Sequence, residues 1–182
     1  MAIGEMGLVK EARNGSETAF LTLYHRHRDP VFRFAYRLTS SAATAEDITQ
    51  ECFMAMLKGA GFNGTNLRAY LFGIVRHLAG KHMRLMVRET DLNPDAAEFN
   101  DPSGELISAE RASLVEEAVR TLPLLQREAL VLFEYENLSL EEIAGVTGSS
   151  IGVVKARLHR ARETLRQKLA PLFAECPERR CS

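Results

Sequence analysis

Basic side chains cluster near the end of the chain, on a segment with helical spacing. Apolar residues recur at positions 151, 154 and 158, a spacing typical of the buried face of a helix. The other faces carry six basic residues opposed by Glu163 alone. The basic residues are Lys155, Arg157, Arg160, Arg162, Arg166 and Lys168. A rigid helix with this charge suits the phosphate-lined major groove of DNA.

The segment before this helix predicts a second, shorter helix that crosses it. Ser139 can cap its start, and Glu142, three residues later, completes a capping box. Ile143 and Ala144 are expected to face inward, and Gly148 supplies the positive φ of a turn at low cost. The spacing predicts that Ile151, Val154 and Leu158 bury the second helix. Together the two segments predict a helix-turn-helix that binds DNA.

The charges of the chain are unevenly distributed. The net charge of −1 argues against a nonspecific nucleic-acid binder. Residues 65–88, however, contain five basic residues and no acidic one, whereas residues 89–110 contain seven acidic residues and no basic one. Each block alone is compatible with a solvated helix face. Two basic blocks separated by an acidic segment favour two DNA contacts joined by a linker that avoids DNA.

The elements that must position these charges predict an all-α fold of two small helical domains. The first domain spans residues 1–88, with helices at about 5–13, after Ser16, from Pro30, at about 42–58 and from 67 to about 87. Residues 89–105 predict a flexible acidic linker. The second domain spans 106–174, with helices to about Arg120 and from Pro123 to Tyr135 before the helix-turn-helix, and 175–182 form a tail.

Several functional classes are disfavoured. The chain has no apolar run of membrane-spanning length and no evident secretory signal, so we expect a cytoplasmic protein without membrane insertion. The histidines and cysteines, among them His25, His27, Cys176 and Cys181, lack zinc-ligand spacing. No nucleophile–base pair or phosphate-cradling glycine loop is evident. We therefore expect no metal, no cofactor and no enzymatic activity.

Four stretches in this order resemble a sigma factor of the extracytoplasmic-function type, within the sigma-70 family. Residues 19–24 with 31–38 resemble the opening of its promoter-melting domain. Residues 45–53 resemble its polymerase-binding helix, and 66–79 resemble its promoter-melting segment. Residues 122–129 with the helix-turn-helix resemble its minus-35-reading domain. The resemblance covers roughly residues 8–172.

An acidic, amide-bearing stripe lies within the polymerase-binding stretch. Its members lie three and four residues apart, on or near one helix face, and are Glu46, Asp47, Gln50 and Glu51, with apolar Phe53 beside them. Such a stripe suits docking on a basic partner, although it is also compatible with a solvated face. The resemblance implies that the partner is core RNA polymerase, through its β′ clamp helices, with the β flap as a further contact.

The helix from residue 67 combines basic and aromatic residues, as single-stranded DNA binding requires. By resemblance it opens the minus-10 element, with candidate contacts at Arg68, Tyr70, Arg76, His77, Lys81 and Arg84. Phe72 is a further candidate for base stacking, whereas Leu71, Ile74 and Leu78 are expected in the core. The family often has Trp at position 70 and Asn at position 77, so no base preference is transferred.

The resemblance also assigns the minus-35 contacts. Lys155, Ala156, His159 and Arg160 map to the base-facing positions of the recognition helix, and Arg157 and Arg162 are expected at phosphates. Ala156 cannot hydrogen-bond a base but can pack on a thymine methyl group.

The favoured interpretation is an initiation factor that binds core RNA polymerase and directs it to promoter DNA with minus-10 and minus-35 elements. Sigma factors of this type are often held by an anti-sigma factor, which the resemblance adds to the candidate partners. Two alternatives stay open. One is an autonomous helix-turn-helix regulator, and the other is an interaction protein that docks on polymerase but blocks initiation.

Overall fold

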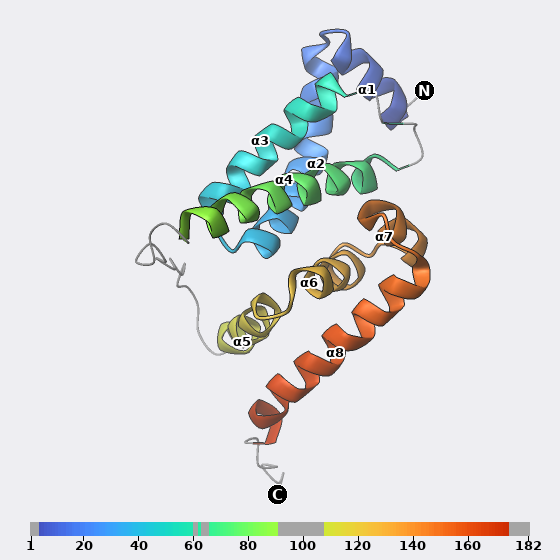
Figure 1. Cartoon of the computed structure of the whole chain (residues 1–182). Helices are drawn as coiled ribbons and strands as arrows, with labels where there is room; N and C mark the ends of the chain where they lie inside the picture. Colours follow the sequence, from blue (N-terminus) through green and yellow to red (C-terminus); the bar gives the residue numbers. More distant parts are fainter. Residues whose placement is uncertain (1–3, 60–61, 63–65, 91–107, 175–182) are drawn as a thin grey trace, which may run out of the picture.

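The computed structural model describes residues 4–59, 62, 66–90 and 108–174, and every regular element there is helical. The first domain contains α1 (Glu5–Arg13), α2 (Glu17–Thr39), α3 (Ala42–Lys58) and α4 (Leu67–Thr90). The second contains α5 (Ser108–Arg120), α6 (Leu124–Leu130), the π-helical segment η1 (Val131–Tyr135), α7 (Leu140–Thr147) and α8 (Ile151–Ala174) (Figure 1). The all-α prediction is confirmed. The linker was predicted to begin at residue 89, but residues 89 and 90 belong to α4, so that boundary is wrong. The rest of the linker and the tail, with Cys176 and Cys181, lie outside the described residues.

The first domain packs α2, α3 and α4 around one apolar core. Leu23, Phe34, Ile48, Met56 and Leu71 have no accessible surface there. Helix starts are fixed locally, because the side chains of Ser16 and Ser41 accept hydrogen bonds from the N–H groups of Ala19 and Thr44. No helix among the described residues is long and apolar enough to cross a membrane.

Pro30 lies inside α2 rather than at the start of a new helix, so that prediction is wrong. Proline lacks an N–H donor and usually breaks a helix. Here the buried stripe continues across it, with His27, Val31, Phe34 and Leu38 all on the core side. Burial of this stripe against α3 and α4 stabilises both halves of the helix and outweighs the one lost hydrogen bond.

The helix-turn-helix is confirmed in its local details. Ser139 and Glu142 form the capping box, and Gly148 ends α7 with a φ of 61°. Val154 and Leu158 bury α8 against the domain, whereas Ile151 is 37% exposed and its predicted burial is wrong. Ile151 is the first residue of α8, and the buried stripe begins one turn later.

Candidate nucleic-acid and polymerase interfaces

Helix α8 presents its predicted base-facing residues to solvent. Lys155, Ala156, His159 and Arg160 are all exposed, and their spacing places them on one face. The opposite face holds the buried Val154 and Leu158. In Figure 1, α8 forms the outer edge of the second domain, on the side away from α1 to α3.

The two arginines expected at phosphates have different surroundings. Arg162 is half-exposed; its Nη2 lies 2.7 Å from Glu134 Oε1 and its guanidinium lies 5.2 Å from the Phe133 ring centroid. Arg157 is only partly exposed, and its charge acts on the buried Glu128. Both arginines thus have partners within the second domain.

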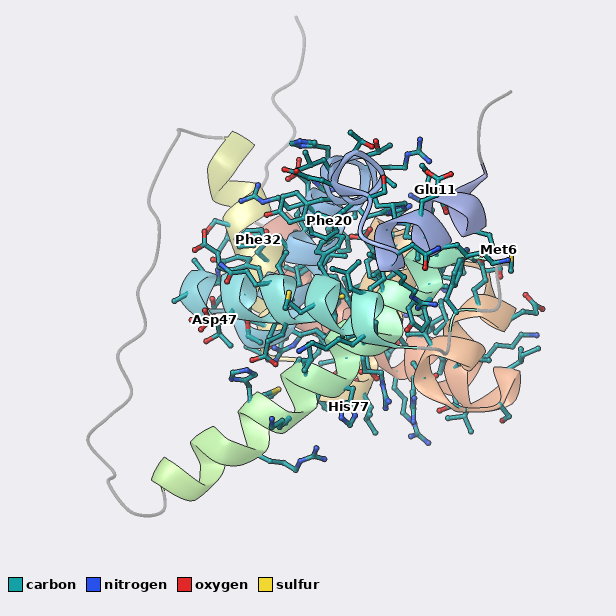
Figure 2. All side chains as sticks on the ribbon, turned by 90° about the horizontal axis from the view of Figure 1, so that it is seen from above. Met6, Glu11, Phe20, Phe32, Asp47 and His77 are labelled. Atoms are coloured by element: carbon teal, nitrogen blue, oxygen red, sulfur yellow. The ribbon has the colours of Figure 1, made fainter. Side chains whose placement is uncertain are left out.

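Three of the candidate minus-10 residues of α4 are exposed. His77, Lys81 and Arg84 are exposed at spacings of four and three, on one face; His77 is labelled in Figure 2. Tyr70 is half-buried, with its ring centroid 5.5 Å from that of Phe62. Phe72 is fully buried, and its ring centroid lies 4.9 Å from that of Phe34. Its predicted role in stacking bases is therefore wrong.

The acidic stripe of α3 is exposed, but Phe53 does not belong to it. The exposed members are Glu46, Asp47, Gln50 and Glu51, and Asp47 is labelled in Figure 2. Phe53 is 2% exposed, and its ring packs against Tyr24 at 5.0 Å and edge-on to Phe20 at 6.3 Å. Helical phase explains the error, because Phe53 lies on the buried face with Thr49 and Met56.

Met54 is the large apolar residue that does lie on the acidic stripe. It is 52% exposed, and it follows Asp47 and Gln50 at spacings of seven and four. The same three-and-four spacing that defined the stripe could have identified it from the sequence.

Comparison with known proteins identifies the family. Residues 23–86 match the model of sigma-70 region 2, and residues 112–165 match that of sigma-70 region 4. The sigma factor CarQ of Myxococcus xanthus is 33% identical over 90% of this chain and 96% of its own length. The chain belongs to the extracytoplasmic-function sigma factors of the sigma-70 family. Sigma factors direct RNA polymerase to promoters.

Two further relatives agree with this assignment. The sigma factor BldN of Streptomyces coelicolor is 34% identical over 90% of this chain, which spans only 65% of BldN. The structure of the sigma factor RpoE in complex with the anti-sigma factor NepR from Bartonella quintana matches with a TM-score of 0.71 and 30% identity. That match covers 83% of this chain and 96% of RpoE.

In this sigma factor the first half of α4 packs against the second domain, where it meets acidic side chains. Arg68 forms an ion pair with Glu136, and Nε of Arg76 lies 2.7 Å from Glu128 Oε1. Asn66, just before α4, donates a hydrogen bond to Glu142. Figure 1 shows α4 between the rest of the first domain and α6 with α7. We call Glu128, Glu136 and Glu142 the interdomain acids.

The interdomain acids differ in burial and in pKa. Burial raises the pKa of Glu128, and the nearby Arg76 opposes that shift. The pKa of Glu142 is lowered, chiefly because its carboxylate accepts a hydrogen bond from the backbone N–H of Ser139. The side chain of Glu136 is 1% exposed. No local pattern in the sequence links these residues to α4. Arg68 and Glu136 are 68 positions apart, and Asn66 and Glu142 are 76 positions apart.

A second group of contacts joins the end of α2 to the second domain. Arg127 donates to the carbonyl oxygen of Leu38 at 3.1 Å, and burial lowers the pKa of its guanidinium. The guanidinium of Arg37 lies 4.2 Å from the centroid of the Tyr135 ring. The two domains therefore meet along both α2 and α4.

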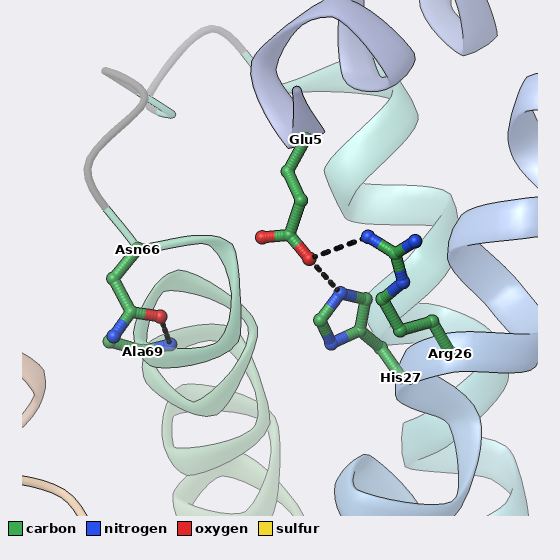
Figure 3. A network of polar contacts seen from close by, with 5 residues as sticks. All are labelled: Glu5, Arg26, His27, Asn66 and Ala69. Atoms are coloured by element: carbon green, nitrogen blue, oxygen red, sulfur yellow. Dashed lines mark hydrogen bonds and ion pairs between the residues drawn. The ribbon is translucent and has the colours of Figure 1, made fainter. Parts of the chain in front are cut away.

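The starts of α1 and α4 are fixed by the polar contacts drawn in Figure 3. Glu5 Oε1 lies 2.9 Å from His27 Nε2 and 3.3 Å from Arg26 Nη1, which ties α1 to α2. Burial lowers the pKa of His27. Asn66 accepts a hydrogen bond from the N–H of Ala69 at 3.0 Å and so caps α4.

Proposed function

We propose that this sigma factor docks on core RNA polymerase through the α3 stripe with Met54, melts the minus-10 element with α4 and recognises the minus-35 element with α8. The observation that carries the proposal is the exposure of both functional faces on one chain. The acidic stripe of α3 and the residues Lys155, Ala156, His159 and Arg160 of α8 are all accessible. Each face has the chemistry that its partner requires, carboxylates for a basic helix and cations for DNA.

The partners follow from this assignment of faces. The α3 stripe is assigned to the β′ clamp helices, the second domain to the β flap, and α4 and α8 to promoter DNA. Catalysis of RNA synthesis belongs to the polymerase, so the protein works in the cytoplasm as a non-enzymatic subunit. Because the RpoE relative was solved with NepR, we include an anti-sigma factor among the partners.

Charge reversal on α3 tests the docking face. Asp47→Lys with Glu51→Lys should weaken binding to core polymerase about tenfold or more, since it replaces attraction by repulsion at the interface. Met54→Ala should weaken binding by a smaller factor. The matched control is Glu11→Lys with Glu17→Lys, because both residues are exposed on other helices of the same domain. The measurement is a titration with core polymerase, followed by transcription from a promoter library.

The control makes the outcome specific. If the α3 and control variants bind core polymerase equally well, then α3 is not the docking face. If the wild-type chain fails to direct core polymerase to any promoter, the whole functional proposal is wrong.

A further inference from the structure

Gly59, which caps the end of α3, lies against Tyr70 of α4. Its φ of −83° and ψ of 143° are extended backbone that any residue can adopt, so the conformation does not require glycine. A Cβ at position 59, however, would lie 2.9 Å from the hydroxyl oxygen of Tyr70 and 2.9 Å from the carbonyl oxygen of Ala55. Only a residue without a side chain lets the Tyr70 hydroxyl approach the end of α3 this closely.

Tyr70 lies on the face of α4 that carries exposed basic residues. His77, Lys81 and Arg84 follow it at spacings of seven, eleven and fourteen, which place all four residues on one side of the helix. The Tyr70 ring is half-buried, and its centroid lies 5.5 Å from that of Phe62. A single strand that follows the three basic residues along α4 therefore meets an aromatic ring, the combination by which proteins hold unpaired bases.

We infer that Gly59 is a positioning residue for Tyr70, holding its ring where a base of the melted minus-10 strand can stack on it. The hydroxyl contacts the end of α3 and the ring contacts Phe62, so the Tyr70 side chain has little freedom to turn. A ring that is ordered before DNA arrives loses less conformational entropy when a base stacks on it. The inference rests on the proposed role of α4 in melting the minus-10 element.

A methyl group at position 59 should act mainly on Tyr70. The Tyr70 hydroxyl is the far end of a side chain and can move by rotation about the side-chain torsions. The Ala55 carbonyl, in contrast, belongs to the last turn of α3 and accepts a hydrogen bond from the N–H of Gly59 at 2.7 Å. The methyl group therefore displaces the ring before it displaces the helix end. Tyr70→Phe removes the oxygen that the methyl group would meet and so makes room for it.

The test combines Gly59→Ala and Tyr70→Phe, singly and together, in the full-length chain. The matched control, Gly4→Ala, adds the same methyl group to another glycine of extended backbone in the same domain, where nothing lies within 4 Å. Each variant is assembled with core polymerase. Transcription is then compared between a duplex promoter that the wild type recognises and the same promoter with a premelted minus-10 bubble. The duplex-to-bubble ratio reports melting, because the bubble removes the need to separate the strands.

We expect Gly59→Ala to lower the duplex-to-bubble ratio about fivefold or more, the lower end of what stacking of one base contributes. In the Tyr70→Phe background, the same change should lower the ratio by less than about twofold, because the methyl group no longer meets an oxygen. The contact of the methyl group with the Ala55 carbonyl is common to both backgrounds. The difference between the backgrounds therefore isolates the contact with Tyr70.

The position of the ring can be measured in the free protein without polymerase. The chain has four tyrosines, and ¹H–¹³C spectra of ring-labelled tyrosine should resolve them. The Tyr70 signals are those that Tyr70→Phe removes. Gly59→Ala should move these signals and leave those of the other three tyrosines in place, whereas Gly4→Ala should move none.

Gly59→Ala should fold, because alanine can adopt this backbone conformation, and circular dichroism with core-polymerase binding checks each variant. Unmoved Tyr70 signals in Gly59→Ala would overturn the inference. Moved signals with the duplex-to-bubble ratio of Gly4→Ala would also overturn it, as would an equal effect of Gly59→Ala in both backgrounds. The proposed function fails separately, if the wild-type chain directs core polymerase to no promoter, and the spectra of the free protein do not depend on that result.

Discussion

The two helices assigned to promoter DNA differ in what already contacts them. On α8, which lies at the outer edge of the second domain in Figure 1, Lys155 and Arg160 are exposed to solvent. On α4, Arg68 and Arg76 pair with buried glutamates of the opposite domain. Both helices are rich in basic residues. Lys155 and Arg160 of α8 are exposed and could contact DNA, whereas Arg68 and Arg76 of α4 already form ion pairs within the protein. A basic block in a sequence therefore indicates which side chains can bind DNA, but not which are free to do so.

The same difference separates arginines that stabilise the fold from arginines that do not. An exposed arginine adds little to the free energy of unfolding. Arg76 compensates a carboxylate that is almost fully buried, and its loss leaves that charge without its nearest partner. One substitution made on both helices can test this contrast.

The largest effect is expected for stability. Arg76→Ala should lower the free energy of unfolding by about 2–3 kcal/mol, at or below the lower end of the usual cost of breaking a buried pair, since the arginine is partly exposed. Arg160→Ala should change it by less than about 0.5 kcal/mol. Urea denaturation followed by circular dichroism measures both. Adding Glu128→Gln to Arg76→Ala should recover most of the loss, and equal effects on α4 and α8 would contradict the comparison.

A second prediction separates base reading from charge within α8. Arg160 lies in the exposed base-facing stripe, whereas Arg166 lies further along the helix and pairs with Glu163 at 2.6 Å. Arg160→Ala should cost about 1–3 kcal/mol of discrimination between matched and altered minus-35 sites. Arg166→Ala should weaken all sites equally and lower the salt dependence by about one phosphate contact.

Transcription by the holoenzyme from a set of minus-35 variants at two salt concentrations measures both effects. If Arg160→Ala reduces transcription from every variant by one common factor, Arg160 contacts the backbone rather than a base.

Local features of this fold could be predicted from the sequence because neighbouring residues determine them. The capping box of Ser139 and Glu142, the positive φ of Gly148 and the bounds of α1 and α3 all depend on residues within a few positions. The acidic stripe of α3 was predicted for the same reason, since helical spacing alone places its members together.

The errors arise where packing between distant segments decides the outcome. Pro30 stays within α2 because α3 and α4 bury the halves of α2 on both sides of this proline. Phe53 is buried because α2 supplies Phe20 and Tyr24 around it. The pairing of Arg68 with the buried Glu136 joins residues of separate domains, and such pairing has no periodic signature in the sequence.

The smallest effect concerns the pH dependence of stability. The pKa values of two interdomain acids, Glu128 and Glu142, are shifted in opposite directions. Burial raises the pKa of Glu128 above its ordinary 4.5, so the folded protein holds this proton at a pH where the unfolded chain has lost it. Stability contributed by this group therefore decreases as the pH rises from 4.5 through the folded pKa. Hydrogen bonds lower the pKa of Glu142 below 4.5, so its contribution is present above 4.5 and is lost as the pH falls through the folded pKa.

Glu128→Gln and Glu142→Gln should therefore change the pH profile of stability with opposite slopes. Relative to the wild type, Glu128→Gln should gain stability as the pH rises above 4.5, because it removes a carboxylate whose ionisation burial opposes. Relative to the wild type, Glu142→Gln should lose stability as the pH rises toward 4.5. Its amide oxygen accepts the hydrogen bond from the Ser139 N–H less strongly than a carboxylate does. Urea titrations between pH 3.5 and pH 7, interpreted by proton linkage, measure both slopes. Parallel profiles for the two variants would show that burial in the domain contact does not distinguish Glu128 from the half-exposed Glu142.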